Sequence, residues 1–120
     1  MKLHDAELRV MDVLWKEGEA SASHIAEVLA AKYEYSKTTT YTLIKRCIDK
    51  SAIARQDPGF LCSALISQAQ VQEMETSELI DKLYDGAADM LVASVLGSGR
   101  LSKEDVERLR RMVEEWSDME

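Results

Sequence analysis

The turn sequence Asp57-Pro58-Gly59 places the tightest constraint on how this chain can fold. It separates two short runs that contain apolar residues, AIARQ at 52–56 and FLCSALI at 60–66. Asp, Pro and Gly in succession favour a reversal of the backbone. Two short apolar-containing runs around such a turn predict a β-hairpin.

Three helical segments are expected before the hairpin. Residues 5–17 carry apolar side chains on two sides, which is typical of a helix that is covered on two faces. Ser21 is a favourable N-cap for a second helix, and Ser36 for a third that covers about 37–50. Three helices followed by a hairpin is the order of a winged helix-turn-helix domain, which we place at residues 1–66.

The rear of the chain, residues 67–120, is expected to be helical. Residues 68–85 form a long helix, residues 87–96 are apolar on nearly all sides, and residues 102–119 carry apolar side chains at heptad spacing. No second domain is available within the chain to cover these faces, so we predict that 67–120 is a helical dimerisation domain of a homodimer. The predicted interface residues are Leu79, Leu83, Tyr84, Met90, Leu91, Val95, Leu96, Val106, Leu109, Val113 and Trp116.

The charge is distributed unevenly along the chain. The net charge of −7 by itself argues against binding to nucleic acid. Residues 1–62, however, hold nine Lys/Arg and nine Asp/Glu, whereas residues 63–120 hold six and thirteen. Residues 36–50 contain four cations and only one acidic residue, Asp49. A neutral front half with one basic helix, followed by an acidic rear half, indicates two separate roles.

A helical wheel of residues 37–50 separates two faces. One side is predicted to face the core and carries Thr40, Leu43, Ile44 and Cys47. The opposite side has hydroxyls in its first turns and cations in its last, which suits a recognition helix in a major groove. The alternative is an ordinary amphipathic helix with a solvated polar face. The predicted DNA-binding residues are Ser36, Lys37, Thr38, Thr39, Tyr41, Thr42, Lys45, Arg46, Lys50 and Arg55.

Four segments occur in order with characteristic spacing: AELRVMDVLW at 6–15, TTYTLIKRCIDK at 39–50, LIDKLYDG at 79–86 and LSKEDVERLRRMVEE at 101–115. Together they resemble the family of penicillinase and methicillin-resistance repressors (BlaI/MecI) and copper-transport repressors (CopY). The resemblance implies a homodimeric winged-helix transcriptional repressor that binds an inverted-repeat operator in double-stranded DNA. The family's recurring Thr, Thr, Arg and Lys fall on Thr39, Thr42, Arg46 and Lys50. Arg46 has a second candidate role, in which it stabilises the helix through Asp49 or Glu7.

Several positions depart from the family pattern. The turn of the wing has no cation, which leaves Arg55 at its base. Ser94 and Val95 stand where the β-lactam branch is cleaved at an Asn-Phe bond, and the cysteine cluster of the copper branch is absent. The inducer or sensor partner is therefore left open. The uncharged wing and the net charge also leave an alternative, a winged-helix interaction module or co-regulator without specific DNA binding.

Other classes of function are not favoured by the sequence. It contains no nucleophile–base set and no Gly-rich phosphate loop, so we expect a non-enzyme without cofactor or metal. There is no apolar run of about 18 residues and no signal-peptide pattern, so we expect a cytoplasmic protein without membrane contact. Cys47 is expected in the core, and Cys62 on the hairpin is the candidate for an exposed, redox-active thiol.

Overall fold

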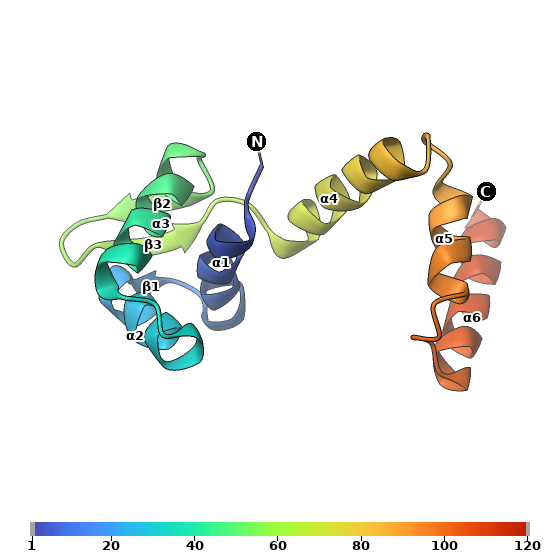
Figure 1. Cartoon of the computed structure of the whole chain (residues 1–120), viewed down its shortest axis with the longest axis horizontal. Helices are drawn as coiled ribbons and strands as arrows, with labels where there is room; N and C mark the ends of the chain where they lie inside the picture. Colours follow the sequence, from blue (N-terminus) through green and yellow to red (C-terminus); the bar gives the residue numbers. More distant parts are fainter. Residues whose placement is uncertain (1, 120) are drawn as a thin grey trace. The chain divides into compact units, whose positions relative to one another are not determined.

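The computed structural model describes residues 2–119, which divide into two compact units with the boundary between residues 73 and 74. The fold is mostly helical with one small antiparallel sheet (Figure 1). This confirms the predicted fold class. In chain order the elements are α1 (Asp5–Glu17), β1 (Ala20–Ser21), α2 (Ala22–Tyr33), α3 (Lys37–Asp49), β2 (Ile53–Gln56), β3 (Leu61–Ala64), α4 (Gln68–Leu83), α5 (Ala88–Leu96) and α6 (Lys103–Met119).

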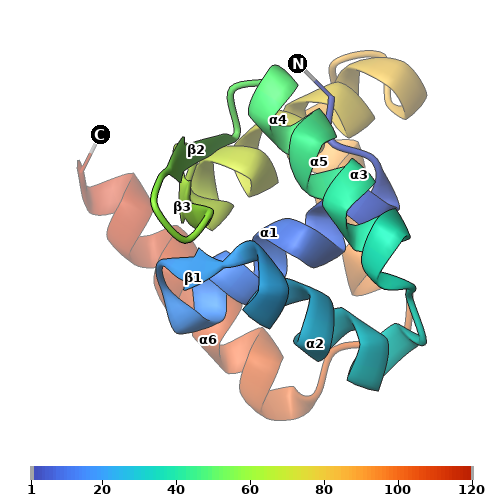
Figure 2. The ribbon, with the colours of Figure 1, turned by 90° about the vertical axis from the view of Figure 1, so that its left-hand side faces the viewer.

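The helices of the N-terminal unit begin at the predicted caps. Ser21 Oγ accepts a hydrogen bond from the backbone N–H of His24 at 3.1 Å. Ser36 Oγ does the same for Thr39, also at 3.1 Å. These serines satisfy backbone donors that a helix start otherwise leaves unpaired. A short turn through Glu34, with φ of 60°, joins α2 to α3 (Figure 2).

The hairpin of β2 and β3 forms where the Asp-Pro-Gly turn predicts it. The two strands are antiparallel, with Ile53 opposite Ala64. The structure adds a strand that was not predicted, because β1 pairs with the other edge of β3 and sets Ala20 opposite Cys62. A two-residue strand is too short to show an alternating pattern in the sequence. It closes the edge of β3 and ties the α1–α2 connection to the wing.

One hydrophobic core holds the N-terminal unit together. Val10 and Met11 of α1 are completely buried, so this helix is covered on two faces as predicted. Trp15 Nε1 donates to the backbone carbonyl of Ile66 at 3.0 Å, which fixes the segment that leaves the wing. Val71, in the first turn of α4, is also part of the core. The compact unit therefore extends past the predicted domain boundary at residue 66.

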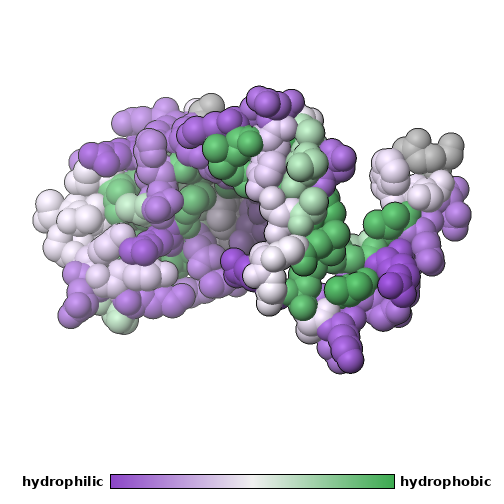
Figure 3. All heavy atoms as spheres, turned by 45° about the vertical axis from the view of Figure 1, so that its right-hand side comes forward, coloured by the Kyte–Doolittle hydropathy of each residue, from purple (hydrophilic) through white to green (hydrophobic). Residues whose placement is uncertain are grey.

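In the C-terminal unit, none of the described residues of α5 or α6 is buried. At the start of α6, Ser102 and Asp105 form a capping box, in which each side chain accepts a hydrogen bond from the backbone N–H of the other residue. Helix α4 ends at Leu83, two residues before the predicted end at residue 85, because Asp85 and Gly86 both have positive φ. Apolar side chains gather on this unit in Figure 3. Across residues 2–119, no helix has the length and apolarity needed to span a bilayer.

Candidate nucleic-acid interface

The two faces of α3 lie as the helical wheel predicts. Thr40, Leu43, Ile44 and Cys47 are buried against the core, which confirms the predicted inner face. The outer face is solvent-exposed and belongs to the second helix of a helix-turn-helix pair, the element that enters the major groove in such domains. The exposed residues on it are Lys37, Thr38, Thr39, Thr42, Lys45 and Arg46.

Threonine hydroxyls on this face are fixed by local hydrogen bonds. Ser36 Oγ donates to Thr39 Oγ1 at 2.9 Å. Thr42 Oγ1 donates to the carbonyl oxygen of Thr38, one turn earlier, at 3.0 Å. Because its proton is used within the helix, the Thr42 hydroxyl can offer an external partner only its lone pairs. Its methyl group adds an apolar contact of the kind that thymine methyls accept.

The cations in the later turns of α3 are not neutralised within the protein. Lys45 and Arg46 are exposed, and neither side chain makes a hydrogen bond or ion pair with any described residue. Arg46 makes no hydrogen bond or ion pair with Asp49 or Glu7, so its alternative role as a stabilising partner is not supported. Free guanidinium and ammonium groups next to exposed hydroxyls are suited to phosphate oxygens and base edges.

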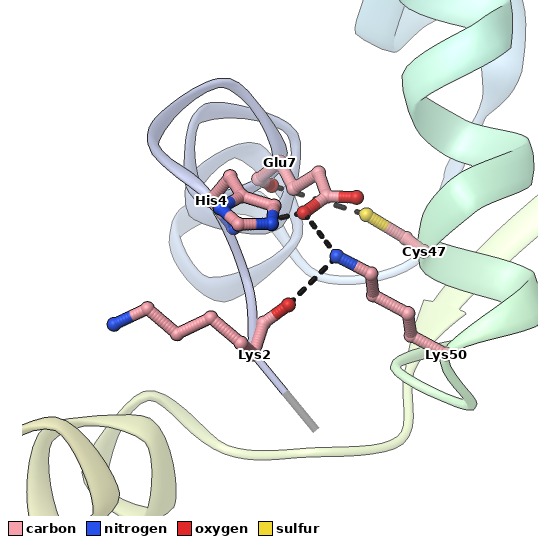
Figure 4. A network of polar contacts seen from close by, with 5 residues as sticks. All are labelled: Lys2, His4, Glu7, Cys47 and Lys50. Atoms are coloured by element: carbon pink, nitrogen blue, oxygen red, sulfur yellow. Dashed lines mark hydrogen bonds and ion pairs between the residues drawn. The ribbon is translucent and has the colours of Figure 1, made fainter. Parts of the chain in front are cut away.

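Lys50 does not share this exposed environment. Its Nζ lies 2.6 Å from Glu7 Oε1 and donates to the backbone carbonyl of Lys2 at 2.7 Å (Figure 4). The structure therefore directs this predicted DNA contact inward. The sequence had no local signal for the pair, because 43 residues separate the two partners.

The wing is folded back on α3 through aromatic contacts. The edge-to-face pair of Tyr41 and Phe60 has ring centroids 5.7 Å apart. The guanidinium carbon of Arg55 lies 3.6 Å from the Phe60 ring centroid, and its Nε lies 3.1 Å from Asp57 Oδ2. Lys37 Nζ lies 5.6 Å from the Tyr41 centroid. The predicted DNA contact Arg55 is thus present at the surface but already paired with a carboxylate.

A second cluster, absent from the sequence-based set, holds the turn before α3. The Arg9 guanidinium carbon lies 4.1 Å from the centroid of the Tyr33 ring. Arg9 Nη1 also donates to the Tyr35 hydroxyl at 2.9 Å. These contacts join α1 to the residues that lead into the Ser36 cap. They fix the position at which α3 begins.

Both cysteines are buried, although only Cys47 was predicted to be. Cys47 is buried in the core as predicted, and burial raises the pKa of its thiol to about 12. Cys62 was the candidate for an exposed thiol, and this was wrong, because its side chain packs in the core of the N-terminal unit and is 0% exposed. Burial raises the pKa of Cys62 as well. Neither thiol has the accessible thiolate that redox sensing requires.

The predicted dimer residues carry exposed apolar surface. Leu83, Val113 and Trp116 are 66%, 61% and 63% exposed. Tyr84, Leu91 and Leu109 are half-buried, and the Tyr84 hydroxyl donates to Ser94 Oγ at 3.0 Å. The remaining predicted residues are also exposed: Leu79, Met90, Val95, Leu96 and Val106. Within residues 2–119, no group of three or more His, Cys, Asp or Glu side chains could hold a metal ion.

The fold and the outer face of α3 define a winged-helix protein of the transcription-regulator class. The sequence model of the penicillinase repressor family matches residues 3–115. The chain therefore belongs to the penicillinase repressor family, whose members are winged-helix repressors and not enzymes.

Individual relatives agree with this assignment. The penicillinase repressor of Bacillus licheniformis is 27% identical over 95% of this chain and 91% of its own length. The methicillin resistance regulatory protein MecI of Staphylococcus aureus (strain N315) is 28% identical over 93% of each chain.

Two solved structures resemble more than half of the chain. The DNA-binding domain of the repressor BlaI is 28% identical, with a TM-score of 0.54 over 57% of this chain and 87% of that one. The monomeric form of Bacillus licheniformis BlaI in complex with the blaP half-operator has a TM-score of 0.52, again at 28% identity, over 58% of this chain and 88% of that one.

Proposed function

We propose that this protein represses transcription by binding an inverted-repeat operator as a homodimer, with α3 in the major groove of each half-site. The observation that carries the proposal is the outer face of α3. It presents exposed threonine hydroxyls in its first turns and the unpaired cations Lys45 and Arg46 in its later turns. Hydroxyls and cations on one helix face match base edges and phosphates in a groove. The relative solved with a half-operator gives independent support for DNA as the ligand class.

The homodimer is supported by the apolar surface of the C-terminal unit. Large apolar side chains are exposed on α5 and α6, and Trp116 is an example at 63%. Exposed apolar clusters of this kind mark protein interfaces. A second copy is the appropriate partner because two identical DNA-binding units joined by a two-fold axis match an inverted repeat. Linking two half-site contacts also raises the overall affinity without new contacts.

A second candidate function is a winged-helix interaction module without specific DNA binding. The specific observation in its favour is the pairing of Arg55 with Asp57, which leaves the wing without a free cation. The net charge of −7 also argues for the interaction module and against DNA binding. We favour DNA binding because Lys45 and Arg46 of α3 are free, whereas Arg55, the cation at the base of the wing, is paired.

A salt titration separates the two functions. Fluorescence anisotropy would follow a labelled duplex taken from the region upstream of the protein's own gene, with a shuffled duplex as the control. The proposal predicts tighter binding to the upstream duplex and a steep loss of affinity as salt rises. No binding to either duplex at low salt would favour the interaction module.

A further inference from the structure

A buried ion pair joins the first helix to the end of α3. Glu7 lies in the first turn of α1 and is only 2% exposed. Lys50 is the C-cap residue of α3, and its side chain is 28% exposed. The distance of 2.6 Å between Lys50 Nζ and Glu7 Oε1 is short for a charge-assisted hydrogen bond. The pair therefore connects two helices at the point where one begins and the other ends.

Other contacts converge on the same two side chains. Lys50 Nζ donates to the carbonyl of Lys2, and Glu7 Oε1 accepts from the backbone N–H of His4 at 2.8 Å (Figure 4). The second carboxylate oxygen, Glu7 Oε2, is buried and has no hydrogen-bond partner among the described residues. Lys50 is consequently the cation on which the buried carboxylate depends. The N-terminal segment, α1 and α3 are held together at this point.

The local fields of both helices favour this arrangement. A carboxylate in the first turn of α1 lies at the positive end of that helix dipole, and an ammonium at the C-terminus of α3 lies at the negative end of the other. The Cys47 thiol, one turn before the end of α3, also approaches the backbone carbonyl of Glu7, at 3.9 Å. The end of α3 is thus fixed to α1 both by packing and by charge.

The position of this end controls the position of the outer face. Helix α3 has 13 residues and is therefore about 20 Å long. Over that length, a tilt of about 3° about one end moves the other end by about 1 Å, which is larger than the tolerance of about 0.5 Å for a preorganised contact. Loss of the pair would displace Thr42 relative to a base edge without removing any group from the outer face.

We propose that Glu7 is a positioning residue for DNA binding, acting through Lys50, and that Lys50 is an internal counter-ion and not a DNA contact. The inference rests on the proposed function. It removes Lys50 from the predicted DNA-binding set and adds Glu7, which touches no DNA. If the two residues are coupled, replacing either one alone weakens binding, and this loss disappears when both are replaced by apolar groups of similar length.

A double-mutant cycle in the full-length protein tests this. The variants are Glu7→Met, Lys50→Met and the double variant, with Lys45→Met as the control for a cation on the outer face. Thermal unfolding is measured without DNA. Binding to the upstream duplex is measured at a temperature at which all variants are folded. At the same temperature, binding to a random-sequence duplex gives the salt slope, which is the steepness with which the logarithm of the affinity falls with the logarithm of the salt concentration.

Each single Met variant should melt at a lower temperature and bind the upstream duplex at least about fivefold more weakly, with the native salt slope. The double variant should recover the melting temperature, and its affinity for the upstream duplex should lie within about twofold of the native value. Lys45→Met should keep the native melting temperature and lower the salt slope by about one. If a single variant fails to fold, the salt slope of the double variant still tests whether Lys50 contacts phosphate.

Two results would overturn the inference. A double variant whose salt slope stays lower by about one would show that Lys50 contacts phosphate. Single variants that are folded and bind with native affinity would show that the pair supports the fold alone. Failure of the native protein to bind either duplex is a different outcome, which contradicts the proposed function itself.

Discussion

Replacing Thr42 with Val tests whether α3 reads base edges. The two side chains have nearly the same shape, so the change removes the hydroxyl and keeps a methyl group at the same place. In the protein the Thr42 hydroxyl already donates to the Thr38 carbonyl at 3.0 Å. In a groove it could therefore only accept a hydrogen bond, for example from the exocyclic amine of adenine or cytosine.

This geometry sets the size of the expected effect. One neutral hydrogen bond contributes about 0.5–1.5 kcal/mol, which corresponds to a loss of about 2- to 13-fold in affinity for Thr42→Val. Thr42→Ala also removes the methyl contact, which adds about 0.8 kcal/mol if the methyl is buried against a base. Thr42→Ser keeps the hydroxyl and should lose only the methyl part.

The assay is anisotropy with the upstream duplex and a random duplex at the same salt. Both Val and Ala variants should weaken binding to the upstream duplex, with Ala the more severe, and leave random binding nearly unchanged. Because Thr42 is solvent-exposed, the melting temperature should change little. Equal losses on both duplexes, or no loss on either, would refute direct reading of bases by this residue.

Three further predictions concern the wing, the dimer and the response to acid. Asp57→Asn should free the Arg55 guanidinium, tighten binding to random DNA and raise the salt slope by about one, and an unchanged slope would contradict this. Val113→Glu should place a charge in the predicted dimer surface and give a monomer by sedimentation at concentrations where the native protein is a dimer. The control variant Glu114→Gln should remain a dimer. A dimeric Val113→Glu variant would exclude this surface as the dimer interface. Burial opposes ionisation of Glu7, but the hydrogen bond from Lys50, the hydrogen bond from the His4 N–H and the nearby charges outweigh it and hold the Glu7 pKa below its ordinary value of 4.5. A lowered folded-state pKa gives stability that is present above pH 4.5 and is lost as the pH falls through the folded-state value. Below pH 4.5, the melting temperature of the native protein should therefore fall more than that of the variant carrying both Glu7→Met and Lys50→Met. Equal decreases in melting temperature would contradict this prediction.

The elements that the sequence predicts well are those specified by neighbouring residues. The caps at Ser21 and Ser36 each depend on a residue three positions away, and the structure shows both bonds. The inner face of α3 follows from helical periodicity alone, and its four predicted residues are all buried.

Contacts between residues that are distant in the sequence could not be predicted from local patterns. Lys50 fits the exposed end of a recognition helix by its spacing, yet its partner Glu7 lies 43 residues earlier. Cys62 could not be recognised as buried, because it faces the core from a strand of only four residues, which is too short to show which of its faces is buried. In both cases the environment of the residue is set by tertiary packing and leaves no periodic signal in the sequence.

In the proposed function, two copies of α3, related by a two-fold axis, read one DNA site. The most direct test is to determine which sequences the full-length protein enriches from a random duplex library. We expect an inverted repeat whose half-sites are separated by about one helical turn, 10–10.5 bp, or a multiple of it. Alanine at both Lys45 and Arg46 should abolish that enrichment. Enrichment of an asymmetric single site, or of no sequence at all, would contradict DNA binding by a two-fold symmetric dimer.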